Sequence, residues 1–450
     1  MVTATIRDVE RVLAEKDLLE FLRYVQIPDP PPAGTGIVQF ALWPHILRLH
    51  AAVEATAPGG VLPVLKARKL GATSYFEARD VWIAQYQSGA FLPVISQGEN
   101  EAKKVIADCK IIWEHLPDHL RVDQVGDNAE VMRFRRGGTI QAFPATSTAT
   151  RSYTGTEVLF DEADMHPYFN VAFDAAMPLI RDTGGHLYAV STPNPEKADS
   201  AFRRLYRRSD HRLYLGYFDR PGRTEETYRE GLALASDPAN YEKENSRNEA
   251  EALAPPRASA YFDVDVMTAM DADIREPRET LRGAVSVWQR PVVAGRYVLG
   301  ADTAWGKTGS YNCAVVLDYQ TGAQVAEMHG RLHPDDMAQE CFELHKLYNH
   351  AYMGLERAGE GQERDGESVV VVDKVVELLR GCSCSGRLYY HDHESVRPSV
   401  PGWQTDGRSR PVLLGEFAEA VRNRLIVIRS RRTLDEMLSF IRNDRGRPQA

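Results

Sequence analysis

The chain has 450 residues, of which 43% are hydrophobic and 26% charged, and its formal net charge at pH 7 is −9. This length predicts two or three globular domains, and the sequence has no run of about 18 uncharged apolar residues that would span a membrane. The charged N-terminus lacks the apolar core of a secretory signal. The net negative charge argues against a protein coated with nucleic acid, but it does not exclude nucleic-acid binding by a local basic patch.

The N-terminal half alternates apolar runs with amphipathic segments. The runs VLPVLKA, AFLPVIS, GTIQAFPA, TEVLFDE and HLYAVSTP predict strands, and ENEAKKVIADCKIIWEHL predicts a helix between two of them. This alternation is typical of an α/β domain with a mostly parallel sheet.

A more polar, proline-broken stretch follows over residues 220–290, and a second α/β pattern then begins at RYVLGADTAWG. It continues with YNCAVVLDYQTG and AQVAEMHGRLH as strands, PDDMAQECFELHKLYNH as a helix, and AYMGLE as a further strand. We therefore expect a domain boundary between residues 255 and 290.

Residues 61–80, VLPVLKARKLGATSYFEARD, predict a strand, a basic turn and the start of a helix. Such a turn binds phosphate when backbone N–H groups at the helix N-terminus point at the phosphate oxygens. Gly71 would allow close approach of the backbone, and Thr73, followed by Ser74, would bind Mg²⁺ through its hydroxyl. The lysine that usually precedes the hydroxyl residue is replaced by Ala72. The loop holds other cations that would supply the missing charge: Lys66, Arg68 and Lys69.

Two later strand ends complete a nucleotide-hydrolysing pattern. The strand in TEVLFDEAD ends at Asp161 and Glu162, roughly 90 residues after the loop. An aspartate there would hold Mg²⁺, and the following glutamate would orient or deprotonate the attacking water. The strand HLYAV leads to Ser191, Thr192 and Pro193, where a hydroxyl pair would sense the γ-phosphate. The sequence thus predicts an ATPase site that includes Asp161, Glu162 and Thr192.

Two acids in the second half also lie at predicted strand ends. Asp302 ends the strand of RYVLGAD, and Glu356 ends that of AYMGLE. A pair of carboxylates at neighbouring strand ends can share two divalent cations. From spacing alone, solvated turn residues are an equally open interpretation.

The segments KARKLGATS, TATRSYTGTEVLFDEAD and AVSTPNP together resemble the ATPase of the large terminase subunit of tailed bacteriophages, or of a related prophage or gene-transfer particle. This family packs DNA into a prohead. The resemblance implies that Arg68 takes the family's loop arginine, Thr73 the Mg²⁺ hydroxyl, and Ser191 to Pro193 the coupling motif. Asp161 and Glu162 become the Walker B pair. Arg151 in TRSYTG matches an arginine that acts on the ATP of a neighbouring subunit.

The resemblance continues on both sides of these motifs. VQFALWPHILRLH is similar to the adenine-side motif, with Phe40, Trp43 and Pro44 as contacts, although Ile46 stands where the family often has glutamine. Asp302 and Glu356 match two metal-binding acids of an RNase H-like nuclease.

Two departures concern the nuclease acids. Ser310 replaces an aspartate that is common in the family, and the family's last catalytic aspartate falls beyond GRPQA, where the sequence ends. Asp444 lies in the turn before that point and is not assigned. We therefore expect an incomplete nuclease metal site, by truncation or by natural absence.

The resulting organisation is a P-loop ATPase motor domain with a mostly parallel sheet at 1–255, a linker at 256–290, and an RNase H-like nuclease domain with a mixed sheet at 291–450. The expected cofactors are ATP and Mg²⁺, with Mn²⁺ as an alternative at the nuclease site. The expected partners are double-stranded DNA, a portal protein, a small terminase subunit and further copies in a ring on the portal, with a monomer in isolation. The expected location is the host cytoplasm, transiently at the portal vertex, without a membrane.

Two other functions remain open at this stage. A helicase-like ATPase with a recombination or repair nuclease would need further helicase motifs, and residues 196–290 show none. A non-hydrolysing ATP-binding assembly module is favoured by Ala72 and by the incomplete acids.

Three further kinds of residue group give weaker indications of function: the cysteines, a His-Asp-His stretch and two arginine-rich stretches. Five cysteines without framework spacing predict free thiols. His391, Asp392 and His393 are adjacent and cannot easily converge on one metal. The arginine-rich stretches RRLYRR and RNRLIVIRSRR are either solvated faces or basic patches.

Overall fold

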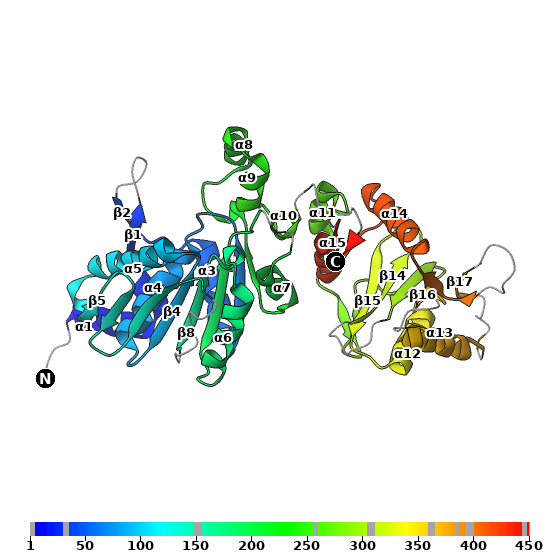
Figure 1. Cartoon of the computed structure of the whole chain (residues 1–450), viewed down its shortest axis with the longest axis horizontal. Coiled ribbons are helices and arrows are strands. Elements are labelled where there is room, and N and C mark those ends of the chain that lie inside the picture. Colours follow the sequence, from blue (N-terminus) through cyan, green and yellow to red (C-terminus); the bar gives the residue numbers. More distant parts are fainter. Residues whose placement is uncertain are drawn as a thin grey trace. The chain divides into compact units, whose positions relative to one another are not determined.

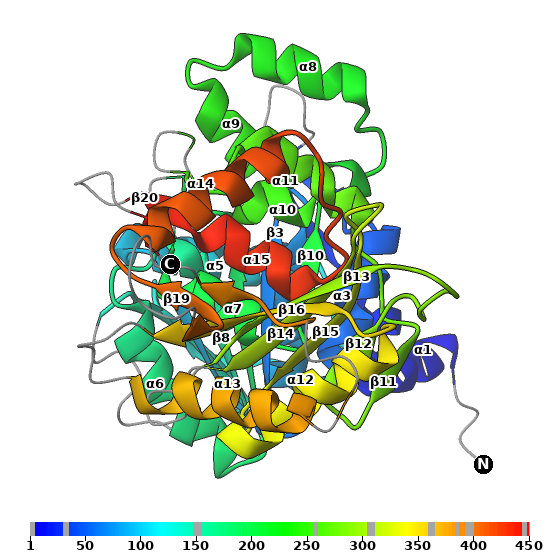
Figure 2. The same cartoon turned by 90° about the vertical axis from the view of Figure 1, so that its right-hand side faces the viewer.

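The computed structural model describes the chain apart from residues 1–4, 30–35, 147–154, 196, 198, 256, 258–259, 304–310, 359–364, 381, 383–386, 392–399, 443–447 and 450. The chain folds into two compact units, Met1–Pro256 and Arg257–Ala450. Figures 1 and 2 show the elements of both units from two directions. Each unit is α/β, as predicted.

The described part of the first unit is built on an eight-stranded sheet whose larger portion is parallel. Strands β6 and β5 extend one side of it in antiparallel order. The sheet order is β10 (Leu213–Leu215), β3 (Val61–Lys66), β9 (His186–Ser191), β8 (Glu157–Asp161), β4 (Phe91–Ser96), β7 (Thr139–Pro144), β6 (Val131–Phe134) and β5 (Gln124–Asp127). The five predicted strands are thus β3, β4, β7, β8 and β9. All except β7 are buried almost throughout, as is typical of strands covered on both faces, whereas β7 alternates buried and half-buried residues.

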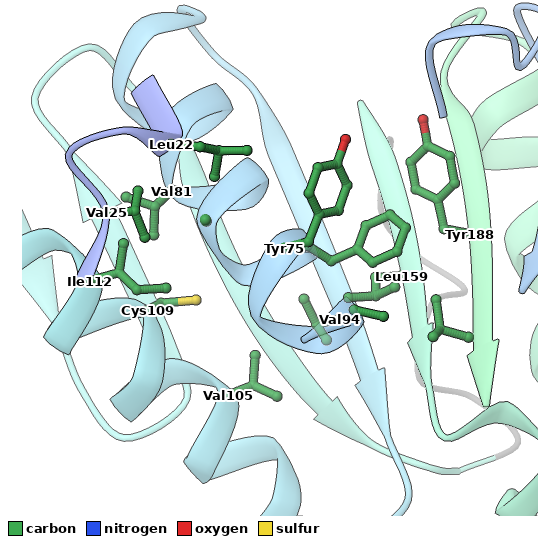
Figure 3. Close-up of a cluster of buried hydrophobic side chains, with 14 of the residues drawn as sticks. Leu22, Val25, Tyr75, Val81, Val94, Val105, Cys109, Ile112, Leu159 and Tyr188 are labelled. Atoms are coloured by element: carbon green, nitrogen blue, oxygen red, sulfur yellow. The ribbon is translucent and has the colours of Figure 1, made fainter. Parts of the chain in front are cut away.

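Helices cover both faces of this sheet. On one face, α4 (Ala72–Tyr86) and α5 (Glu99–Glu114) pack with α2 (Leu18–Leu22), as Figure 3 shows for Leu22, Val81 and Cys109. On the other face, α6 (Phe169–Arg181) places Phe169 against the ring of Phe160. Because α4 is buried almost all round, it holds the loop before it against the sheet edge.

The remaining described elements of the first unit lie at its periphery. A two-stranded ribbon pairs β1 with β2 in antiparallel order. The others are α1 (Ile6–Lys16), β1 (Gln26–Asp29), β2 (Gly36–Gln39), α3 (Pro44–Glu54), η1 (Asp118–Leu120), η2 (Ala163–Met165), α7 (Ala201–Arg208), η3 (Tyr217–Asp219), α8 (Glu225–Leu234), α9 (Pro238–Glu244) and α10 (Glu249–Leu253).

The described part of the second unit has a mixed seven-stranded sheet. Strands β13 and β16, and β16 and β19, are parallel, whereas the other neighbours are antiparallel. The order is β11 (Glu279–Leu281), β12 (Val285–Val287), β15 (Gln324–Gly330), β14 (Asn312–Asp318), β13 (Tyr297–Asp302), β16 (Tyr352–Ala358) and β19 (Trp403–Thr405). This is the mixed sheet that was expected.

The helices of the second unit also lie on both sides of its sheet (Figure 2). Helices α12 (Pro334–Leu347) and α13 (Asp365–Arg380) share the core of buried residues with the strands. On the other side lie α11 (Val264–Met270), α14 (Ser409–Arg422) and α15 (Arg431–Ser439). The short elements are η4 (Asp271–Asp273), β17 (Tyr390–His391), β18 (Val400–Pro401), β20 (Ile441–Arg442) and β21 (Pro448–Gln449).

The segment predicted as a linker, 256–290, differs from that expectation where it is described. It contains α11, and its strands β11 and β12 extend the second sheet through β15. These strands are three residues long, and β11 is the outermost strand of the sheet, so their sequences are too short to predict a strand.

Two other predictions concern the cysteines and membrane-spanning segments. Cys109, Cys313 and Cys341 are free thiols as expected, whereas Cys382 is disulfide-bonded, which corrects the prediction for that residue. None of the described helices has the length and apolar content needed to cross a lipid bilayer.

Candidate active sites

The parallel register brings three strand ends of the first unit together. Strand β9 lies between β3 and β8, with Leu65 opposite Ser191 and Asp161 opposite Val190. Parallel strands end at one edge, so the basic loop after β3, the hydroxyl pair after β9 and the acids after β8 meet there. This edge is the candidate ATPase site.

Glu162 is held at the centre of this site. Its backbone has φ +51°, a left-handed conformation that is unfavourable for a residue with a Cβ. Lys66 Nζ donates to one carboxylate oxygen at 3.0 Å, and the Thr192 hydroxyl and backbone N–H donate to the other at 2.8 and 2.9 Å. Burial alone would raise the pKa of Glu162, but Lys66 and the Thr192 hydrogen bonds outweigh it and lower the pKa to about 2.

Asp161 faces the start of α4. The Thr73 hydroxyl donates to Asp161 Oδ1 at 3.0 Å. Burial, together with the negative charge of Glu162, raises the pKa of Asp161 to about 6. A hydroxyl beside a carboxylate is a donor set of the kind that Mg²⁺ prefers, so these residues fit the predicted metal.

The loop between β3 and α4 has the conformation that a phosphate-binding turn needs. Gly71 is the N-cap of α4 with φ +76°, and Lys69 also has positive φ. Ala72, at the position of the usual lysine, is buried at 1% exposure. The cation that reaches the site is therefore Lys66, at the end of the strand.

Side chains from distant segments bind the carbonyl groups of this loop from outside. Arg223 Nη2 donates to the Arg68 carbonyl at 2.9 Å, and Arg220 Nη1 donates to the Lys69 carbonyl at 3.0 Å. His45 Nε2 lies 2.7 Å from the Leu70 carbonyl. Three consecutive carbonyls are thus fixed, which restricts the orientation of the peptide planes that present N–H groups to a phosphate. The sequence analysis missed these three residues because none lies near the loop in the chain.

Other predicted ATP contacts lie elsewhere or beyond the described residues. The Arg68 guanidinium pairs with Glu244 of α9 at 2.9 Å and is 59% exposed, because that carboxylate draws it away from the acids. Ser74 lies in the first turn of α4, and Lys69 is exposed. Arg151 falls outside the described residues.

The predicted adenine-side residues surround the loop. Phe40 is buried, and a Cβ on Gly71 would lie 3.8 Å from its ring. The Trp43 ring stacks with the Arg220 guanidinium at 5.1 Å, and Pro44 is the first residue of α3. These residues shape the back of the loop and contact the arginine that fixes it.

A buried network behind Glu162 was also missed by the sequence analysis. Asp164 accepts from the Arg203 Nε at 3.0 Å and from the Asn194 N–H at 2.7 Å, and it interacts with the Ser200 hydroxyl. Both charged side chains are fully buried. The Asp164 N–H donates to the Ser191 hydroxyl at 2.9 Å. The acid strand, the hydroxyl pair and the start of α7 are therefore joined by buried hydrogen bonds. Because Arg203 is buried in this network, the stretch RRLYRR is only partly a solvated face.

The two acids of the second unit are cross-strand neighbours. Ala301 is opposite Leu355 in the parallel pair β13 and β16, so Asp302 and Glu356 follow side by side. Desolvation, then the hydrogen bond and charge of Glu356, raise the pKa of Asp302 to about 7. Glu436 of α15 lies close enough to add to this shift, and the sequence analysis did not single it out. A proton shared by two carboxylates marks a place where a cation would be stabilised.

The described residues do not complete a metal cage. Within the described ranges, no group of three or more His, Cys, Asp and Glu side chains is arranged to hold a metal ion. Ser310, Asp444, Asp392 and His393 fall outside those ranges, so the predictions about them stay predictions.

This chain is similar to several solved structures. Neither a protein-family model nor a curated protein matches this sequence significantly. Among solved structures, a large terminase from a thermophilic bacteriophage is 11% identical, with 91% of this chain and 95% of that chain covered and a TM-score of 0.38.

Two single-domain structures are also similar. The ATPase domain of the large terminase of Thermus phage P74-26 covers 44% of this chain and 90% of its own, at 16% identity and a TM-score of 0.35. The large terminase nuclease of thermophilic phage G20c with bound magnesium covers 41% and 85%, at 22% identity and a TM-score of 0.30. The chain is thus similar to solved proteins of the family that its motifs resemble. At these identities the likeness concerns the fold.

Proposed function

We propose that this protein is a DNA-packaging motor that hydrolyses ATP to move double-stranded DNA and cuts that DNA with a metal-dependent endonuclease. The observation that carries the proposal is the convergence of Lys66, Thr73, Asp161, Glu162 and Thr192 at one edge of the parallel sheet. A cation, a metal-binding pair and a general base are the parts that phosphoryl transfer to water requires.

In the ATPase site, the loop before α4 binds the phosphates and Lys66 stabilises their charge. Mg²⁺ held by Thr73 and Asp161 would neutralise negative charge on the phosphates when bound. Glu162 orients the attacking water and accepts its proton. With Lys66 paired to it, Glu162 is a weak base, because its pKa is about 2. When the phosphates attract Lys66, the pKa of Glu162 rises towards its ordinary value and its basicity increases.

Thr192 connects this chemistry to the rest of the unit. Its hydroxyl and N–H both bind Glu162, and the neighbouring Ser191 binds the Asp164 network. A shift of the Glu162 carboxylate during turnover therefore pulls on the start of α7. This path supports a motor in which hydrolysis moves a basic surface against DNA.

In the second unit, Asp302 and Glu356 would hold the nuclease metals. Divalent ions bound there would activate water and stabilise the leaving oxygen of a phosphodiester. The two carboxylates are the part of that site that the described residues supply.

The packaging role and its partners rest on the motif resemblance. In this proposal the protein assembles as a ring on a portal protein in the host cytoplasm, and Arg151 acts on the ATP of a neighbouring subunit. A small terminase subunit would bring it to concatemeric DNA.

One observation favours a second candidate. Lys66, the cation that replaces the missing loop lysine, is engaged by the catalytic glutamate rather than left open to phosphate. A non-hydrolysing ATP-binding assembly module would keep this pairing when ATP binds.

Two matched variants separate these activities. Glu162→Gln is expected to abolish ATP turnover and leave DNA cleavage, whereas Glu356→Gln is expected to abolish cleavage of plasmid DNA with Mg²⁺ or Mn²⁺ and leave ATP turnover. Both are measured on the full chain with DNA and portal present. Absence of ATP turnover by the unmodified chain under these conditions would favour the assembly module, and cleavage by Glu356→Gln would refute the nuclease assignment.

A further inference from the structure

An arginine-lined pocket of about 410 Å³ lies at one end of the sheet in the second unit. Its walls come from the segment before β11, the residues after β12, the start of β15 and the stretch before α15. The side chains that matter here are Arg275, Arg278, Arg429, Trp288 and Gln324. We call this the arginine pocket.

The arginine pocket lies at the opposite end of the sheet from the nuclease acids. Asp302 is opposite Cys313, at the end of the sheet where β15 finishes with Gly330. Gln324 begins β15, at the other end. Gln324 is opposite Leu317, which is opposite Val298, four residues along β13 from Asp302. That is about 13 Å at roughly 3.3 Å per residue. The pocket therefore cannot belong to the catalytic pair.

Backbone carbonyls hold two of the arginines in place. Arg275 Nη1 donates to the carbonyls of Ala272 and Ile274 at 2.6 and 2.7 Å. Arg429 Nη1 donates to the Asp273 carbonyl at 2.9 Å, with the Asp273 carboxylate 3.7 Å away. Carbonyl groups orient a guanidinium without cancelling its charge, so Arg275 keeps its charge and donors for an anion. The Asp273 carboxylate offsets part of the charge of Arg429.

The floor of the pocket is rigid. Gln324 is buried, and its side-chain oxygen accepts from the N–H groups of Arg429 and Ser430 at 2.9 Å each. The Trp288 Nε1–H donates to the Arg275 carbonyl at 2.7 Å, so the indole itself offers only apolar surface to the pocket. The positions of Arg275 and Arg429 are thus linked through buried partners, which makes the site preorganised.

The pocket carries a net positive charge and is open to solvent. Three arginines and one carboxylate, Glu276, line it, and the Asp273 carboxylate lies 3.7 Å from Arg429, so one positive charge is in excess. Arg275 and Arg278 are exposed. Within the described part of the chain, no ion pair holds Arg278. Of RNRLIVIRSRR, Arg431 and Arg432 pair with Asp271 and Glu327, whereas Arg429 faces the pocket.

We propose that the arginine pocket binds backbone phosphates of double-stranded DNA and holds the duplex away from the cutting site. Guanidinium groups match phosphate oxygens in geometry and charge, and the two exposed arginines at the rim allow a long strand to continue past the pocket, which a closed nucleotide site would not. This inference rests on the proposed function, since it takes DNA as the substrate. A free nucleotide presents the same phosphate chemistry and is separated by the test.

The test measures binding of a fluorescently labelled 30-base-pair duplex to the full chain in EDTA, so that no cleavage occurs, over a series of salt concentrations. Arg275→Ala/Arg278→Ala is expected to weaken binding about tenfold at roughly 0.1 M salt and to reduce the slope of log K against log salt by about 2, because each lost phosphate contact contributes about 0.9. Arg278→Ala alone is expected to give about half of that change in slope, because the Arg278 side chain makes no hydrogen bond or ion pair within the described residues.

Arg290→Ala is the matched control. Arg290 lies two residues after Trp288, but its guanidinium pairs with Glu279 at 2.6 Å, so the same charge is removed without opening the pocket. An equal loss of DNA binding in this control would overturn the proposal, as would unchanged binding by both pocket variants. A selective loss of ATP or poly-glutamate binding, with DNA binding intact, would also overturn it.

The same samples separate this inference from the proposed function. If the unmodified chain binds and cuts DNA and the pocket variants do so equally well, only the arginine pocket is refuted. If the unmodified chain binds no duplex, both are refuted.

Discussion

The ammonium group of Lys66 lies 3.0 Å from a carboxylate oxygen of Glu162, and the Lys66 side chain is only 6% exposed. The pair joins the end of β3 to the end of β8 across β9. It shows which of three neighbouring cations enters the site, and it links the position of that cation to the basicity of the glutamate.

Lys66→Ala is expected to reduce ATP turnover by about 100-fold, the size of effect seen when one preorganised charge-stabilising donor is removed. Steady-state phosphate release measures this. Lys69→Ala removes the same charge from an exposed position in the same loop and is expected to stay within about twofold of the unmodified protein. Equal losses in the two variants would contradict the assignment of Lys66.

Thr192→Val removes the hydroxyl that donates to Glu162 at 2.8 Å and retains the backbone N–H. A hydrogen bond to a charged group is worth about 1.5–3 kcal/mol. We expect kcat to fall about tenfold or more with little change in KM, and Thr192→Ser to restore most of it. Failure of the serine variant to restore kcat would mean that the hydroxyl does not act through Glu162.

Arg223→Ala loosens the phosphate-binding loop from outside. The arginine binds the Arg68 carbonyl and lies over the Tyr217 ring at 4.4 Å. Because it would not touch ATP, we expect KM for ATP to rise about fivefold while kcat changes little. Arg229→Ala, on the exposed side of α8, is the control and should leave both constants unchanged.

Arg79→Met tests a buried ion pair below the site. Arg79 binds both carboxylate oxygens of Glu157, at 2.9 and 2.7 Å, and both side chains are less than 10% exposed. Removal of the cation leaves a buried carboxylate and is expected to cost about 3–5 kcal/mol in the free energy of unfolding of the first unit.

Urea denaturation measures that cost, and two further variants interpret it. Arg79→Met/Glu157→Leu should recover much of the loss, because the buried carboxylate is removed and Glu54, the other partner of Arg79, is 55% exposed. Lys103→Ala breaks the exposed pair with Glu99 and should leave the free energy of unfolding nearly unchanged, because solvent screens that pair. No recovery in the double variant would mean that packing, rather than charge, dominates.

His166 makes the first unit sensitive to acid. Its Nε2 lies 2.9 Å from the Asp161 carbonyl and donates to it, so the buried Nδ1 carries no proton and has no partner among the described residues. Burial lowers the pKa of His166 to about 4, against an ordinary value of about 6.5. Between these values the unfolded chain binds the additional proton, so stability falls as pH falls from about 6.5 to about 4.

The shift corresponds to about 3 kcal/mol of unfolding free energy over that range. Between pH 4 and pH 7, stability should fall more steeply with falling pH in the unmodified chain than in His166→Gln, which does not titrate. The difference between the two isolates His166, because the raised pKa values of Asp161 and Asp302 act in the opposite direction in both proteins. His333→Gln, at an exposed histidine, should keep the full slope. Equal slopes for all three proteins would show that His166 is not the titrating group.

Much of the architecture followed from local patterns. The continuous apolar runs of β3, β4, β8 and β9 predicted the parallel sheet because both faces of such strands are buried. Gly71 marked the start of α4, and Asp161 and Asp302 marked strand ends, because a polar residue after an apolar run stops burial. These signals need only the chain itself.

Other features depended on which segments the fold brings together. Lys66, Arg68 and Lys69 are equivalent in sequence, and only the positions of Glu162 and Glu244 separate their roles. Strands β11 and β12 are too short to signal themselves, and their pairing with β15 decides that they belong to the second sheet.

The sequence alone therefore determined the residue types and the strand ends that the two candidate sites require. Tertiary structure decided which partners those residues meet: the adjacency of Asp302 and Glu356 comes from parallel pairing of β13 and β16, and the outward-facing loop carbonyls are bound by Arg220 and Arg223 from about 150 residues away. The physical reason is that burial patterns are local in the chain, whereas hydrogen bonds and charge pairs act through space.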